Sequence, residues 1–166
     1  MVNEAEIKAM DKQHKWLLTT RALEEISQHA QDAFPEECCG VVLSNGSEDR
    51  VCRLNNIQNQ LHTLDPQTYP RTAAIAYAMD PKELEIVLQQ AQTLGAKLKA
   101  FYHSHPDHEA YFSEEDKAFA SPFGEPTFPE TAQIVVSIYS HGVKRICVFA
   151  WSDEQKDFVE VPLKKI

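Results

Sequence analysis

Cysteine is scarce in this sequence, and the cysteines present form no familiar pattern. The four of them are Cys38, Cys39, Cys52 and Cys147. None forms a Cys-x-x-Cys pair, and small disulfide scaffolds are far denser in cysteine. Free cysteine behaves as a small buried apolar residue. We therefore expect four reduced, mostly buried thiols in a cytoplasmic protein.

Long apolar runs and positive charge are also in short supply. No segment approaches the roughly 20 apolar residues of a membrane-spanning helix, and residues 1–14 contain no apolar core of a secretory signal. Sixteen Lys and Arg stand against 25 Asp and Glu, which gives a formal net charge of −9. Because nucleic acids and anionic membranes attract basic faces, we expect neither as a partner.

The length and the hydrophobic pattern predict one α/β (α+β) domain. We expect a polar N-terminal lead over residues 1–14 and a single domain over residues 15–166. The predicted strands cover 16–18, 72–79, 97–103 and a final stretch near 158–162, and the predicted hairpins cover 38–54 and 132–151. The first predicted helix starts at a cap, Thr19 or Thr20, and runs up to Pro35, and the other predicted helices cover 81–94 and 113–120. This order predicts a mixed sheet flanked by helices.

Two proline-containing segments, 55–72 and 121–130, are predicted to be loops. Loops of this length in compact domains are often functional, and we expect both to form walls of a substrate groove. The alternative is that they simply connect neighbouring elements.

The residue types that carry chemistry gather in the stretch HSHPDHEAYFSEED, at 103–116. His103 and His105 end a predicted strand, where side chains two residues apart share a face. Such a pair, completed by a carboxylate, supplies the three protein ligands of a catalytic Zn²⁺. Asp116 is the best candidate for the carboxylate, in a helix start with Ser113 as N-cap. Taken singly, the capped start is more typical of an ordinary helix, and the His-x-His pair is a weak signal that surface histidines also give.

The combined pattern resembles a known family. The run His103–Pro106, followed by Ser113 and Asp116, resembles the JAMM motif of the MPN+ zinc metalloproteases. The run Pro35–Gly40 is similar to the Pro-x-Glu-x-Cys-Gly pattern of the bacterial members, which assigns the family's glutamate to Glu37. The resemblance is to the stand-alone prokaryotic branch. It implies an MPN/JAMM-like fold, a mixed, curved β-sheet flanked by helices, of the cytidine-deaminase-like kind.

The resemblance also implies a set of roles. His103, His105 and Asp116 are expected to hold Zn²⁺, Glu37 to act as general base and Ser113 to donate a hydrogen bond to the developing oxyanion. Three neighbours stand outside the motif roles and are expected to serve the site less directly or not at all. Ser104 is expected to pack or to support the ligands from behind, and Cys39 to lie in the core or beside the site. His108 is expected as an exposed loop histidine, the alternative being a contact with metal or substrate.

Three functions follow from the resemblance. The first is a zinc peptidase or isopeptidase that hydrolyses an amide bond at the Gly-Gly tail of a ubiquitin-like or sulfur-carrier protein. The second is a zinc amidase acting on a cell-wall peptide or small amide. The third is a metal-free MPN scaffold that binds proteins. Metal content separates the third from the others, and the choice of substrate separates the first two.

Overall fold

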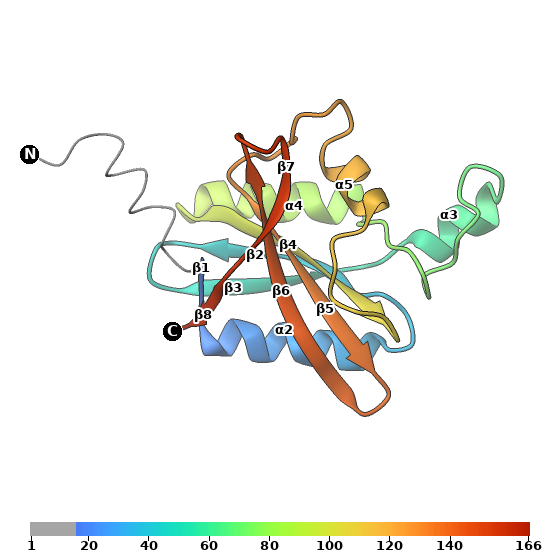
Figure 1. The fold of residues 1–166 in the computed structure, drawn as a ribbon, viewed down its shortest axis with the longest axis horizontal. Coiled ribbons are helices and arrows are strands. Elements are labelled where there is room, and N and C mark those ends of the chain that lie inside the picture. The colour runs from blue at the N-terminus through green and yellow to red at the C-terminus, as the bar shows by residue number, and fades with distance from the viewer. Residues whose placement is uncertain (1–15) are drawn as a thin grey trace, which may run out of the picture.

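The computed structural model describes residues 16–166, and the predicted polar lead at 1–14 lies outside this range. The described chain forms three layers (Figure 1). A central sheet lies between helix α2 (Thr20–Ala33) on one face and helices α4 (Pro81–Thr93) and α5 (Glu114–Ala120) on the other. The predicted fold class is therefore confirmed.

The central sheet is mixed, as the sequence predicts. Within residues 16–166 its strand order is β3-β2-β4-β5-β6-β7. The pair β4 and β5 is parallel, and every other neighbouring pair in this sheet is antiparallel. The strands are β2 (Cys39–Ser44), β3 (Asp49–Leu54), β4 (Lys97–Pro106), β5 (Ala132–Tyr139), β6 (Gly142–Ser152) and β7 (Asp157–Val161).

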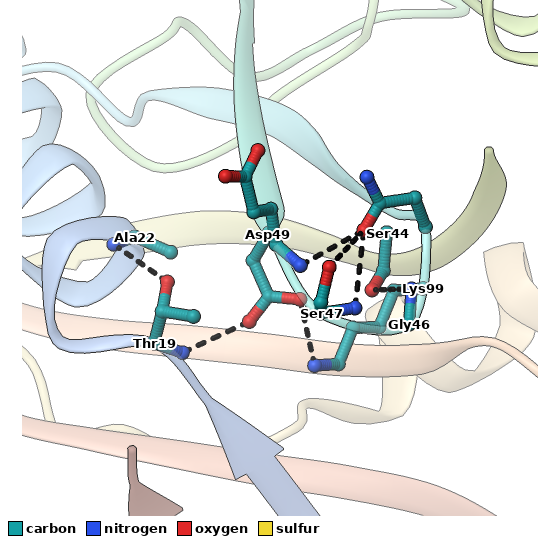
Figure 2. A network of polar contacts seen from close by, with 9 residues as sticks. Thr19, Ala22, Ser44, Gly46, Ser47, Asp49 and Lys99 are labelled. Carbon is teal, nitrogen blue, oxygen red and sulfur yellow. Dashed lines mark hydrogen bonds and ion pairs between the residues drawn. The ribbon is translucent and has the colours of Figure 1, made fainter. Parts of the chain in front are cut away.

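A small ribbon ties the beginning of the described chain to its end. Strand β1 (Trp16–Leu18) pairs in parallel with β8 (Leu163–Lys165), a strand that the sequence pattern did not predict. Figure 2 shows how the start of α2 is fixed beside this ribbon. The buried Asp49 carboxylate accepts hydrogen bonds from the Thr19 N–H and the Lys99 ammonium, both at 2.9 Å. These contacts join α2 to β3 and β4.

Two apolar cores fix the faces of the sheet. On one face, α2 packs its Leu23, Ile26 and Ala30 against strand residues such as Tyr102. On the other face, Leu84 and Val87 of α4 pack on residues such as Phe101. Alternate residues of β4 therefore face opposite helices, as expected for a strand with side chains on both faces.

The structure corrects two predictions about the segment that follows β3. Residues 55–72 are not all loop, because they contain helix α3 (Gln58–Leu64). Residues 72–79 are not a strand, and the β-pairing found among them is an isolated bridge between Asn56 and Met79. The physical reason is that amide side chains from the region of α3 bind this backbone in place of a neighbouring strand.

Two further predictions concern composition. All four cysteines lie in the described range as free thiols, and three of them are buried and Cys52 is partly buried, which agrees with the prediction of mostly buried cysteines. Within residues 16–166, no helix has both the length and the apolar character needed to cross a bilayer.

Candidate active site and metal centre

Strand β4 carries both motif histidines to one side of the sheet. Ala100 and Tyr102 face α2, and Phe101 faces α4. By alternation, His103 and His105 continue the Phe101 side, and both are buried. The strand runs three residues beyond its predicted end, to Pro106, so both histidines lie in regular strand.

Helix α5 brings Asp116 to these histidines. Ser113 is the N-cap, and its Oγ accepts a hydrogen bond from the Asp116 N–H at 3.0 Å. Asp116 Oδ2 accepts one from the Ser113 N–H, also at 3.0 Å, which completes a capping box. The same Oδ2 lies 3.2 Å from His103 Nε2 and 3.5 Å from His105 Nε2. The cap therefore aims the carboxylate at the histidines.

Glu37 reaches the same point from the segment that leads into β2. Cys39 pairs with His103 in the antiparallel register, so Glu37, two residues earlier, continues opposite His105 on the same face. Carboxylate and imidazole atoms of Glu37, His103 and His105 lie within 4.8 Å of one another. Glu36 points elsewhere: it is exposed and its Oε2 accepts a hydrogen bond from Asn59.

The loop after β4 orients His105. The ring Nδ1 of His105 lies 3.0 Å from the Glu109 carbonyl oxygen, which can only accept, so Nδ1 carries the proton and donates it. In the neutral ring, this leaves the Nε2 lone pair free to face Asp116 and His103. The loop is held in turn by β5, because Ser137 Oγ donates to the His108 carbonyl oxygen at 2.5 Å.

Tyr77 orients His103, and the sequence pattern did not single it out. Its ring stacks on the His103 imidazole with a centroid distance of 4.4 Å and an interplanar angle of 23°. Tyr77 belongs to the irregular segment that was predicted to be a strand. A sequence pattern offers no signal for this contact, because the two residues come from separate elements.

Burial and neighbouring groups shift the pKa values of the site in different directions. Burial raises the pKa of Glu37 to about 8. Complete burial lowers the pKa of His103 despite the nearby Asp116 carboxylate. Burial alone would lower the pKa of His105, but hydrogen bonds to Asp116 and to the Glu109 carbonyl raise it. Burial alone would raise the pKa of Asp116, but His103, His105 and the Ser113 N–H hold it well below its usual range.

Glu37, His105, Ser113 and Asp116 line a cavity of about 730 Å³. One wall comes from residues 68–71 and 75–78, and the other from residues 105–119. Of the two segments predicted to wall a substrate groove, 55–72 contributes Gln58 and residues 68–71 to this lining, and the described residues 121–130 contribute none. Exposed apolar side chains stand at its rim: Tyr69, Ile75, Tyr111 and Phe119.

The neighbours predicted to have lesser roles are found as follows. Ser104 is fully buried, and its Oγ accepts a hydrogen bond from the Cys38 N–H at 2.8 Å, which fits the predicted packing role. Cys39 is buried in the α4-facing core and does not line the cavity. His108 is exposed, as predicted, and lines the cavity.

The donor atoms fit a tetrahedral Zn²⁺ site. Bonds of 2.0–2.2 Å in tetrahedral geometry place neighbouring donors about 3.3 Å apart. The distances among His103 Nε2, His105 Nε2 and Asp116 Oδ2 are 3.0, 3.2 and 3.5 Å. Two imidazoles with one carboxylate are also a donor set that suits zinc.

In this fold, two histidines on a central strand face an acid on a capped helix. The chain matches a family model over residues 19–158. This model describes the prokaryotic homologs of the JAB domain, and the chain belongs to that family. The resemblance to JAMM/MPN proteins is thereby confirmed.

Individual relatives agree with this assignment. The chain is 29% identical over 108 residues to a desampylase of Haloferax volcanii, a match that covers 63% of this chain and 71% of the relative. A solution structure from Desulfitobacterium hafniense matches with a TM-score of 0.67 at 23% identity, covering 90% of this chain and 92% of that one. One from Salinibacter ruber matches with a TM-score of 0.56 at 25% identity, covering 89% and 90%. These two structures support the fold.

Proposed function

We propose that this protein is a zinc-dependent peptidase or isopeptidase that hydrolyses an amide bond at the Gly-Gly tail of a ubiquitin-like or sulfur-carrier protein. The observation that carries the proposal is the convergence of two imidazole nitrogens and a carboxylate oxygen at 3.0–3.5 Å, beside Glu37 in a cavity. A solvated acidic loop has no reason to bury three such groups against one another.

In this proposal His103, His105 and Asp116 hold the metal. When bound, Zn²⁺ supplies Lewis acidity, which lowers the pKa of a coordinated water towards about 7 and polarises a carbonyl group. The lowered pKa of His103 favours the neutral imidazole that a ligand must be, and the lowered pKa of Asp116 favours its carboxylate.

Glu37 acts as the general base. Its carboxylate takes a proton from the attacking water and passes it to the leaving amine, so that one group serves both half-reactions. Burial suits this role because it raises the pKa of Glu37, and a carboxylate with a raised pKa is a stronger proton acceptor once ionised.

Ser113 stabilises the charge that develops on the scissile carbonyl oxygen. Its Oγ lone pair already accepts the Asp116 N–H, which is the capping bond. The hydroxyl hydrogen is a separate group and donates to the substrate oxygen. Capping and catalysis therefore use different atoms of one side chain.

The similarity to a desampylase supports a protein modifier as the substrate. A Gly-Gly tail suits the cavity because it brings a backbone without side chains down to Glu37 and Asp116. The exposed rim side chains Ile75, Tyr111 and Phe119 are available to contact the body of such a protein.

We further propose a cytoplasmic location, in keeping with the four free cysteines, and a single domain over residues 15–166.

The adjacent residues Glu36 and Glu37 allow a matched test. The probe is a ubiquitin-like protein extended past its Gly-Gly end by a fluorescent peptide, and the zinc-loaded protein is the enzyme. We expect Glu37→Gln to lower kcat at least about a hundredfold while zinc stays bound, because the proton acceptor is lost. Glu36→Gln, whose carboxylate lies outside the cavity lining, is expected to retain wild-type kcat.

Two results would contradict the proposal in different ways. Equal losses in both variants would remove Glu37 from the mechanism. No cleavage of the probe by zinc-loaded wild type, together with cleavage of a small amide or cell-wall peptide, would replace the proposed substrate.

A further inference from the structure

Asn56 occupies a central position between the segments that carry Glu37 and Tyr77. It lies, half-buried, between β3 and α3. Its Nδ2 donates to the Glu37 carbonyl oxygen at 2.9 Å and to the Ala76 carbonyl oxygen at 3.2 Å. Its Oδ1 accepts from the N–H groups of Gln58 at 3.1 Å and Ala78 at 3.0 Å. Both donors and both acceptor positions of the amide are thus in use.

These bonds hold the backbone of Glu37 against the cavity wall. The Glu37 N–H donates to the Ala73 carbonyl oxygen at 2.8 Å, while the Glu37 carbonyl oxygen is bound by Asn56. Glu37 lies before the first residue of β2, so the sheet ladder of β2 does not include it. Asn56 therefore fixes the backbone of the proposed base, which the hydrogen bonds of the sheet do not reach.

The same amide holds the backbone on both sides of Tyr77. Ala76 and Ala78 precede and follow Tyr77, and both are bonded to Asn56. The Tyr77 ring stacks on His103. A shift of this segment would move the ring, and with it the support of a proposed zinc ligand.

We propose that Asn56 is a positioning residue that sets the Glu37 carboxylate and the Tyr77 ring against His103. It touches no reacting atom and acts through Glu37 and Tyr77. This inference rests on the proposed function, because it assigns Asn56 a part in the same reaction. Groups that support a metal site in this way typically affect activity or metal affinity by 10- to 100-fold.

Asn55 provides the matched control, because it is the same residue type at the adjacent position. Its side chain bonds Glu83 of α4 and none of the site residues. We expect Asn56→Ala to lower kcat on the extended Gly-Gly probe about 10- to 100-fold with little change in KM, since geometry at the reacting bond is lost. Asn55→Ala is expected to retain wild-type kcat. Equal losses in the two variants would overturn the proposal.

A double-mutant cycle separates positioning from general loss of structure. If Asn56 acts largely through Glu37, Asn56→Ala has much less effect on the residual rate once Glu37 is already Gln. The expected result is a strongly non-additive pair. An equal fold-loss in the wild-type and Glu37→Gln backgrounds would overturn the proposal, because it would show that Asn56 acts independently of the base.

A spectroscopic readout keeps this inference testable if the probe is not a substrate. In zinc-free protein, we expect the stacked Tyr77 ring to shift the NMR signals of the His103 ring protons through its ring current. We expect Asn56→Ala to abolish this shift and Asn55→Ala to keep it. Unchanged His103 signals in Asn56→Ala would overturn the positioning role, whereas failed cleavage by the wild type would overturn the proposed function alone.

Discussion

Asp116 combines a structural and a proposed chemical role in a single carboxylate. Its Oδ2 accepts the Ser113 N–H and faces both motif histidines. Replacing Asp116 therefore removes a helix-capping bond as well as a metal ligand, and a lost cap costs about 1 kcal/mol. Any Asp116 variant must be compared with one that changes the same helix without touching the histidines.

The titration of His29 makes the free energy of unfolding depend on pH. Burial, with help from the Arg53 charge, lowers the pKa of His29 to about 4, and its Nδ1 forms a hydrogen bond with the Tyr102 hydroxyl at 2.6 Å. Between pH 6.5 and 4 the unfolded chain then binds more protons than the folded one, so stability falls as the pH falls. We expect the free energy of unfolding to drop from pH 7.5 to 5 by about 1–2 kcal/mol more in the wild type than in His29→Gln.

Urea unfolding at the two pH values measures this difference. The His29→Gln side chain cannot titrate but retains an oxygen that can accept from Tyr102. Parallel losses in the two proteins would show that His29 does not titrate as proposed.

At the scale of elements, Gly40 explains why β2 can lie so close to its neighbours. A Cβ at this position would lie 2.5 Å from the Cys52 carbonyl oxygen of β3 and would collide with the Tyr102 ring of β4. Backbone on one side and a buried ring on the other leave little room to relax. The glycine of the Pro-x-Glu-x-Cys-Gly pattern thus allows β2 to pack against both of its neighbours, β3 and β4.

We expect Gly40→Ala to lower the free energy of unfolding by about 1–3 kcal/mol, because it overpacks the sheet. Chemical denaturation of the two proteins measures the change. Adding Tyr102→Phe should recover part of the loss, since it removes one of the atoms that the new methyl group meets. A Gly40→Ala variant as stable as the wild type would contradict this account of β2.

Elements with local signals could be predicted from the sequence. The N-caps Asp80 and Ser113 predict the starts of α4 and α5. The His-x-His pair at the end of an apolar run predicts two imidazoles on one face of a strand. The segment around α3 has no such signal, because Ile57 makes no side-chain capping bond. The backbone after α3 is held by side-chain amides that are distant in sequence. The Ala73 N–H donates to Asn59, 14 residues away, and the Ala78 N–H donates to Asn56, 22 residues away.

For the whole molecule, the sheet topology explains why the candidate site could be assembled from distant segments. Strands β2 and β4 are neighbours, so the segment entering β2 meets the end of β4, and α5 follows β4 on the same face. The site residues of the motif could be predicted from the sequence through local patterns and a family resemblance. The Tyr77 stack and the Asn56 contacts depend on tertiary packing and could not be read from it.

The most direct test of the account is the zinc content of purified wild type, Asp116→Ala and Glu114→Ala, measured by elemental analysis after zinc is offered and the excess removed. Glu114 is the matched control, because it lies on α5 but is exposed and pairs with Lys117. We predict about one zinc per chain in the wild type and in Glu114→Ala, and none in a folded Asp116→Ala. Wild-type protein without zinc, or Asp116→Ala with it, would contradict the proposed metal centre.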